Sequence, residues 1–84
     1  MDREARELIE FLRRRVVRQP DIELNEDTAL VSSGLVDSFS LVEVLNELER
    51  VTGLQIPAGR VSPLDLDSVR RMLETARRWG QPRK

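Results

Sequence analysis

Apolar side chains recur at helical spacing in three separate stretches of this sequence. The stretches cover residues 2 to about 18, residues 38 to about 52, and residues 67 to about 79. In each of them the apolar residues lie three and four positions apart, which is the pattern of a helix with one buried face. The residues expected to face inward are Ala5, Leu8, Ile9, Phe11, Leu12 and Val16, then Leu41, Val44, Leu45, Leu48 and Val51 or Thr52, and finally Val69, Met72, Leu73 and Ala76. We therefore predict three main helices.

Residues with strong preferences for helix ends stand at the limits of these stretches. Pro20 follows the first stretch, and the residue before a proline is disfavoured in the α region. Gly53 follows the second stretch, where glycine commonly ends a helix. Asp67 or Ser68 can cap the start of the third helix. Pro63 suits the first position of a short helical turn over residues 62–66.

The segment between the first two helices, residues 19–37, has no sustained periodicity. Its apolar residues stand singly along the chain, and we expect them to pack across the bundle: Ile22, Leu24, Leu30 and Leu35. A loop of this length in so small a domain is usually functional. The sequence thus predicts an all-α fold, a small bundle of three main helices plus one short helix, with a long loop between the first and second helices. Residues 1–84 form one domain, and residues 80–84 are expected to fray.

The composition removes most kinds of enzyme from consideration. The 84 residues include neither cysteine nor histidine. Without them the chain lacks a thiolate nucleophile, the usual general base near neutral pH and the commonest zinc ligand. No pair of titratable groups is spaced for acid–base work, so we expect no catalytic residue and no metal site.

The net charge of −1 hides a strong segregation along the chain. Eight acids and no base lie between Asp21 and Glu49, whereas the flanks hold the other seven acids and all 14 bases. A central segment of one sign attracts positively charged partner surfaces and repels phosphate backbones. The basic end of the chain has no interleaved aromatic residues, so we expect no nucleic-acid partner.

The sequence also lacks the features of a membrane or exported protein. No apolar run approaches the roughly 20 residues that span a bilayer, and the first residues have no apolar stretch typical of a secretory signal. We expect a cytoplasmic monomer without membrane contact. Because the chain begins with Met directly before the first helix, we also expect it to be free-standing.

The candidate functional residue is Ser38, at the start of the second helix. Its hydroxyl is expected to be exposed at the positive end of the helix dipole, with Asp37 or Ser38 itself as cap, where backbone N–H groups favour a phosphate. Gly34 permits a positive φ that lets the loop turn sharply before the helix. The alternative is that Ser38 is only a cap, or that Ser40 and Glu43 form a capping box two residues later.

A second Asp-Ser pair, Asp67-Ser68, provides an internal comparison. We interpret it as a helix cap with no further role. Ser38 differs from Ser68 by its context, which includes Gly34 and Leu35 upstream, a long preceding loop and an acidic helix face after it.

The stretch Gly34-Leu35-Val36-Asp37-Ser38 resembles the attachment motif of acyl and peptidyl carrier proteins, and the similarity of elements extends over nearly the whole chain. The resemblance implies that Ser38 is esterified by 4′-phosphopantetheine, which a phosphopantetheinyl transferase takes from coenzyme A. Asp37 then helps to position the transferase and its metal. The thiol of the arm holds an acyl or aminoacyl cargo as a thioester, so the protein itself is not an enzyme.

The resemblance also implies a surface on which partner enzymes dock. These partners are the transferase, a loading ligase or transferase, and downstream condensing or tailoring enzymes. The docking surface is the outer face of the second helix, made by Phe39, Val42, Glu43, Asn46 and Glu47. Phe39 and Val42 are apolar residues that flank the proposed arm on this outward side.

Two differences from well-known carrier proteins indicate the kind of pathway in which this chain acts. The sequence lacks the double glycine before the motif that many peptidyl carriers have, and it is far less acidic overall than carriers of fatty-acid synthesis. We therefore expect a role in specialised biosynthesis of the polyketide, nonribosomal peptide or related kind. The alternative from another class is a cofactor-free helical adaptor that binds proteins and leaves Ser38 unmodified.

Overall fold

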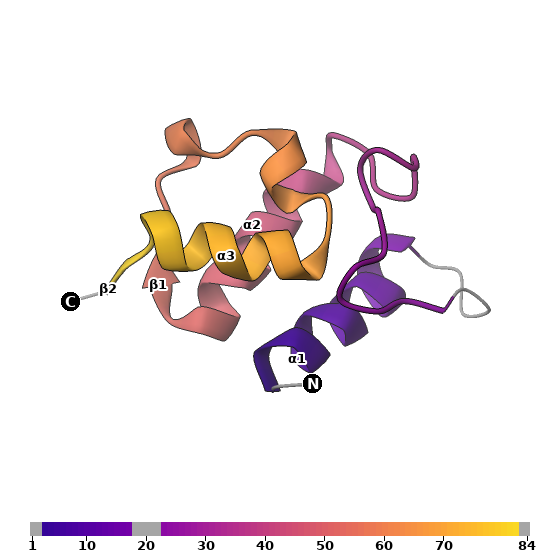
Figure 1. Cartoon of the computed structure of the whole chain (residues 1–84), viewed down its shortest axis with the longest axis horizontal. Coiled ribbons are helices and arrows are strands. Elements are labelled where there is room, and N and C mark those ends of the chain that lie inside the picture. Colours follow the sequence, from indigo (N-terminus) through magenta and orange to yellow (C-terminus); the bar gives the residue numbers. More distant parts are fainter. Residues whose placement is uncertain (1–2, 18–22, 83–84) are drawn as a thin grey trace.

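Three helices form the body of the molecule in the computed structural model, which describes residues 3–17 and 23–82 (Figure 1). They are α1, Arg3–Phe11, which continues as a π-helical segment over Leu12–Val17, then α2, Ser40–Thr52, and α3, Val69–Trp79. Each of the three packs against the other two. The predicted all-α bundle is confirmed, and the predicted ends of the first helix at residues 2 and 18, together with Pro20, lie outside the described residues. In the part of the chain that the structure describes, no helix has both the length and the apolar content to cross a bilayer.

The π-helical segment changes which residue of the first helix faces the core. In a π-helix each turn takes in an extra residue, because the hydrogen bonds join residues five apart. Leu12 is buried, and the residue five positions later, Val17, is buried too, with 7% of its surface exposed. Val16, which the spacing of an α-helix places inward, is only half-buried. Val16 thus packs against the core in part, and Val17, which was not predicted to face inward, takes the buried position.

The helix ends follow the expected chemistry. Gly53 adopts a φ of 72° beyond α2, and its amide donates to the carbonyl oxygen of Glu49 at 2.8 Å. The Ser68 hydroxyl caps α3 by accepting from the Arg71 amide at 3.1 Å. The predicted short helix is present as a 3₁₀ turn over Pro63–Leu66, and a second 3₁₀ turn covers Ala58–Arg60.

Two very short strands join the chain after α2 to the chain after α3. β1, Leu54–Gln55, pairs antiparallel with β2, Gln81–Pro82, with Leu54 opposite Pro82. Gly80 lies against β1, since a Cβ on Gly80 would come within 2.8 Å of Leu54 Cδ1. Within the tail that was expected to fray, Gln81 and Pro82 are thus paired with β1, and residues 83 and 84 lie outside the described residues.

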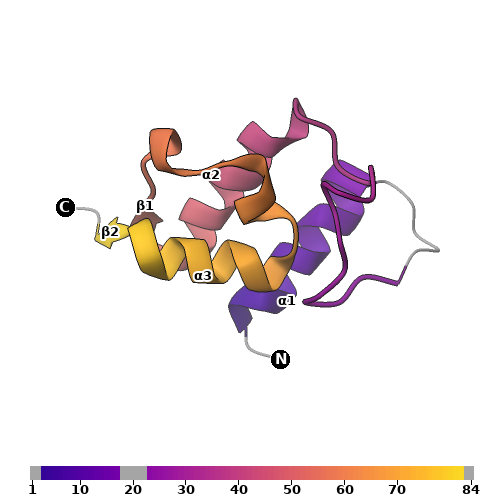
Figure 2. The same cartoon turned by 45° about the horizontal axis from the view of Figure 1, so that its top comes forward.

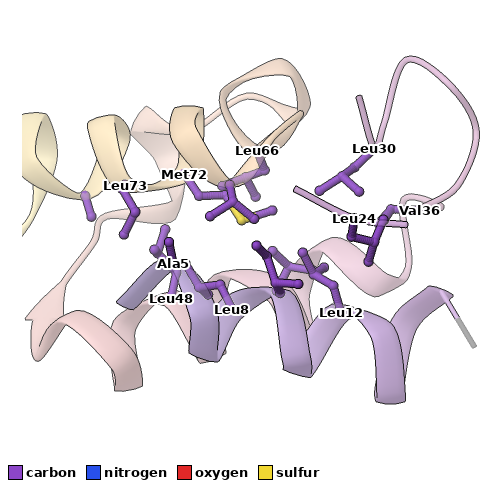
Figure 3. Close-up of a cluster of buried hydrophobic side chains, with 14 of the residues drawn as sticks. Ala5, Leu8, Leu12, Leu24, Leu30, Val36, Leu48, Leu66, Met72 and Leu73 are labelled. Carbon is purple, nitrogen blue, oxygen red and sulfur yellow. The ribbon is translucent and has the colours of Figure 1, made fainter. Parts of the chain in front are cut away.

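The core joins the three helices to the long loop (Figure 3). Its largest fully buried side chains are Leu8, Leu12, Leu30, Leu48, Met72, Val44 and Val69. The loop contributes Leu24, Leu30 and Val36, which Figure 3 shows gathered near Leu12 at one end of the core. The expectation that the loop packs across the bundle is thus confirmed.

The loop differs from the prediction in which residues it buries. Leu35 is half-buried and packs against the core as expected, whereas its neighbour Val36, which was not singled out, is only 4% exposed. Ile22 lies outside the described residues. Without a periodic pattern, the sequence gives no signal for which of two adjacent apolar residues turns inward.

Candidate functional site

A tight turn leads from the loop into α2. Gly34 has a φ of 83°, as its sequence position predicted, and its amide donates to the Val31 carbonyl oxygen at 3.1 Å. The Val36 amide then donates back to the Leu30 carbonyl oxygen at 3.0 Å. Because Leu30 and Val36 are both buried, they hold the two ends of the turn on the core. The residues that follow Val36 emerge on the surface.

Asp37 caps the start of α2. Its Oδ1 accepts a hydrogen bond from the Ser40 amide at 2.9 Å, while the Leu41 amide donates to the Ser38 carbonyl oxygen at 3.3 Å. Ser38 and Phe39 therefore lie in a turn before the regular helix, which begins at Ser40, two residues later than predicted. The alternative capping box between Ser40 and Glu43 is not formed in this described segment.

The capping bond also favours the ionised form of Asp37 at the start of α2. Hydrogen bonds from Ser40, first from its amide and then from its side chain, lower the pKa of the Asp37 carboxyl below its ordinary value. Asp37 is thus a carboxylate at neutral pH, and it already occupies part of the positive end of α2 that was expected to favour a phosphate. The electrostatic attraction for an anion at Ser38 is reduced accordingly.

Ser38 is exposed, and its hydroxyl has no hydrogen-bond partner among the described residues. The next residue, Phe39, is 90% exposed. A hydroxyl in this position can be reached by a second protein and can bear a large group without displacing any core atom. The residues present therefore fit a prosthetic arm attached at Ser38.

The second Asp-Ser pair has the opposite surroundings. Ser68 is only 8% exposed, and its Oγ accepts the capping bond from the Arg71 amide. A group esterified to Ser68 would break this cap and require the start of α3 to open. Both Ser38 and Ser68 follow an aspartate, but Ser38 is exposed and Ser68 is buried.

Asp67 makes contacts that the sequence did not reveal. Its carboxylate accepts hydrogen bonds from the backbone amides of Leu30, Val31 and Ser32 and from the Ser32 hydroxyl. We expected Asp67-Ser68 to be a helix cap alone, and this is correct only for Ser68. No local pattern could have found the contact, because the partners lie 35 to 37 residues apart in the chain.

Nearby, an ion pair ties the loop to α3. Arg70 Nε lies 2.6 Å from Asp27 Oδ1, and the Arg70 amide donates to the Glu26 carbonyl oxygen at 3.0 Å. Both partners of the ion pair are largely exposed, so its contribution to stability is small. Together with the contacts of Asp67, it places residues 26–32 against the first turn of α3 (Figure 2).

The residues predicted to form a docking surface lie on α2 and just before it, with unequal exposure. Phe39 and Val42 are 90% and 65% exposed, and Glu43 and Asn46 are exposed as well. Glu47 differs, because its side chain is only 15% exposed and forms an ion pair with Arg50. The structure therefore brings four of these residues to the surface and partly covers the fifth.

An apolar groove runs beside this surface. It has a volume of about 140 Å³ and lies between α2 and the 3₁₀ turns that follow it. Its lining residues are Leu41, Val42, Leu45, Ala58, Val61, Ser62, Pro63 and Leu66. Leu64, on the 3₁₀ turn over Pro63–Leu66, is 58% exposed. The sequence did not single it out, because one leucine in a short turn belongs to no periodic pattern. Among the described residues, no three acidic side chains are grouped so that they could hold a metal ion.

The described part of the chain thus presents an accessible hydroxyl just before α2, to which a group can be attached. Residues 6–76 match the family model described as a phosphopantetheine attachment site, and the chain belongs to this family. Searches of curated proteins and of solved structures found no match. Members of the family carry 4′-phosphopantetheine covalently on a serine and catalyse no reaction themselves. This chain is accordingly a phosphopantetheine-bearing carrier protein and not an enzyme.

Proposed function

We propose that Ser38 is the serine that carries 4′-phosphopantetheine. The observation that supports this assignment best is the contrast between the two Asp-Ser pairs. The Ser38 hydroxyl is exposed and has no partner among the described residues, whereas the Ser68 hydroxyl is buried and bonded. A transferase must bring coenzyme A to the reacting oxygen, so of these two serines only Ser38 is accessible without unfolding part of the carrier.

The attachment step is a displacement at phosphorus. The Ser38 Oγ attacks the β-phosphorus of coenzyme A, a phosphodiester bond forms, and 3′,5′-adenosine diphosphate leaves. The hydroxyl proton passes to a base that the transferase supplies. The role of the carrier is limited to presenting an accessible hydroxyl next to the Asp37 carboxylate. Asp37 helps to position the transferase and the metal ion that it brings.

The attached arm supplies a thiol that holds an acyl or aminoacyl cargo as a thioester. The chain has no cysteine of its own, so any thioester must form on the arm. Tethering keeps the cargo at a high effective concentration at each enzyme on which the carrier docks. These enzymes are a loading ligase or transferase and downstream condensing or tailoring enzymes.

We assign partner docking to Phe39, Val42, Glu43 and Asn46, with Glu47 at the covered edge of this surface. Exposed apolar residues beside a polar rim are typical of an interaction site. The two exposed apolar side chains, Phe39 and Val42, stand one residue and one turn after Ser38. A partner that binds Phe39 and Val42 therefore lies directly over the arm.

The setting we propose is specialised biosynthesis of the polyketide, nonribosomal peptide or related kind. The supporting features are the Gly34-Leu35 lead without a double glycine and an overall charge of only −1. We expect the carrier to act in the cytoplasm as a monomer.

An intact-mass measurement tests the assignment. The purified chain is incubated with coenzyme A and a promiscuous phosphopantetheinyl transferase, and the wild type is expected to gain the mass of one phosphopantetheine. Ser38→Ala abolishes the gain, and the matched variant Ser68→Ala retains it. A chain that gains no mass under conditions that modify another carrier is instead the cofactor-free adaptor.

A further inference from the structure

Asp67 joins two parts of the chain that are far apart in sequence. Its Oδ1 accepts hydrogen bonds from three consecutive backbone amides, at 3.1 Å from Leu30, 2.7 Å from Val31 and 2.9 Å from Ser32. Its Oδ2 accepts from the Ser32 hydroxyl at 2.9 Å. The Asp67 carbonyl oxygen also accepts from the Leu30 amide, at 2.7 Å. Residues 30–32 are therefore fixed by a single residue at the start of α3.

This carboxylate is not used for capping α3. Its recorded side-chain bonds all go to residues 30–32, and the capping bond of α3 comes from the neighbouring Ser68. A concavity of consecutive amides is an anion site, and hydrogen bonds to an ionised acceptor are about twice as strong as neutral ones. The amide of Ser32, followed by the other bonds from the loop, lowers the pKa of the Asp67 carboxyl, so the group is ionised at neutral pH.

Residues 30–32 are connected to the Asp37-Ser38 pair through the turn that follows them. Leu30 is both the first anchored residue and the acceptor of the bond from the Val36 amide that closes the turn. Val36 is buried, and the next residue, Asp37, caps α2. The position of residues 30–32 thus determines where the turn ends and how the Asp37-Ser38 pair is presented to a partner.

We propose that Asp67 is a positioning residue for the modification of Ser38. It holds the turn over residues 30–36 in the one arrangement that presents the serine to the transferase. This inference rests on the proposed attachment at Ser38. When the bonds of Asp67 are lost, the turn takes up additional arrangements, and only a fraction of the molecules is competent to bind. The apparent affinity for the transferase falls by that fraction, and the rate in the bound complex stays the same.

The test compares the wild type, Asp67→Ala and Asp67→Asn in steady-state transfer of phosphopantetheine from coenzyme A. We expect Asp67→Ala to raise the KM for the carrier about 10-fold with kcat unchanged, since it removes all the side-chain bonds to the loop. Asp67→Asn keeps an acceptor oxygen but loses the charge, so its KM should rise only about threefold. Amide hydrogen exchange should become faster at residues 30–32 in Asp67→Ala while the core amides of α1 and α2 stay protected.

Asp65→Ala is the matched control, because Asp65 also accepts from a backbone amide and a serine hydroxyl, both of Ser62, but does not touch the loop. Its KM should equal that of the wild type. The inference is overturned if the amides of residues 30–32 lose protection in Asp67→Ala while the KM stays the same, or if Asp65→Ala raises the KM equally. If Asp67→Ala does not fold, the inference is tested with Asp67→Asn and Ser32→Ala instead. An unchanged KM in both of these variants overturns the inference. A wild-type chain that gains no phosphopantetheine is a different outcome, which overturns the proposed function itself.

Discussion

At the scale of single residues, the site depends on a few hydrogen bonds made just before α2. Asp37 accepts the Ser40 amide, and Gly34 supplies the positive φ that brings the chain to that point. Neither residue belongs to the core, so each can be changed without opening a cavity. The contribution of each can therefore be measured separately.

The capping bond of Asp37 predicts a specific pH dependence. The folded-state pKa of this carboxyl is lowered, chiefly by the Ser40 amide, so the carboxylate stabilises the fold fully above its unfolded pKa. That stabilisation is lost as the pH falls through the lowered pKa. Side-chain carboxyl shifts followed by NMR should show Asp37 titrating below its ordinary value, and Asp37→Asn should lack this part of the acid destabilisation. Titration at or above the ordinary value contradicts the capping geometry.

Gly34 should tolerate alanine poorly although there is space for the side chain. Nothing lies within 4 Å of a Cβ built on it, but its φ of 83° is strained for any residue with a Cβ. Gly34→Ala should lower the free energy of unfolding by about 1–2 kcal/mol in urea denaturation. Gly59→Ala is the control, because Gly59 also has open space but no positive φ, and its effect should stay within about 0.5 kcal/mol. Equal effects of the two substitutions would show that φ is not the cause.

At the scale of elements, the long helices were predictable and the short elements were not. α2 and α3 have a sustained periodic apolar face and end at residues with clear preferences, so the sequence predicted both within two residues. The π-helical segment over Leu12–Val17 has one extra residue in its turn, and no pattern of residue types in the sequence predicts it. The strands β1 and β2 are two residues each, too short for any alternation of apolar and polar positions.

The pairing of β1 with β2 depends on the small size of Gly80. A Cβ there would meet the Ala76 carbonyl oxygen and lie 2.8 Å and 2.9 Å from the Leu54 side chain. Gly80→Ala should therefore cost about 1–3 kcal/mol of unfolding free energy, as overpacking typically does. NMR contacts between Leu54 and Pro82 should weaken in the same variant. Unchanged stability together with unchanged contacts would contradict this account of the pairing.

The outward face of α2 gives a prediction about docking. Phe39 is 90% exposed, so Phe39→Ala should leave the unfolding free energy within about 0.5 kcal/mol of the wild type. If Phe39 anchors partners, the KM for the carrier in the transferase reaction should rise about fivefold, as for an interface residue worth about 1 kcal/mol. Glu74→Gln, at an exposed position of α3, should change neither quantity. A normal KM for Phe39→Ala removes Phe39 from the docking surface.

At the scale of the whole molecule, folding neutralises part of the charge segregation seen in the sequence. Asp27 pairs with Arg70, Glu47 pairs with Arg50, and a Glu49 carboxylate oxygen accepts the Ile56 amide. The acidic middle of the chain is therefore less available to partners than its count of carboxylates suggests. At the proposed docking surface, charge attraction should come mainly from Glu43 and the neighbouring Asp37, so we expect docking to depend modestly on salt.

The candidate site was predictable where it depends on local sequence, and not where it depends on contacts between distant segments. The positive φ of Gly34 and the capping bond of Asp37 were predictable from the local motif, because both depend on neighbouring residues in the chain, and the attachment at Ser38 stays a prediction from the same motif. The anchoring of the loop by Asp67 depends on a contact between distant segments, which exists only after the helices have packed. The partial covering of Glu47 by Arg50 likewise depends on side-chain placement.

The central claim is that Ser38 bears the arm, and peptide mapping of the modified protein tests it most directly. Trypsin should release residues 19–50 as one peptide, since no Lys or Arg lies between them before Arg50, and Ser68 falls in the separate peptide 61–70. The account predicts that the phosphopantetheine mass lies on the first peptide and that fragmentation localises it to Ser38. The mass on peptide 61–70, or on any other serine of residues 19–50, would contradict it.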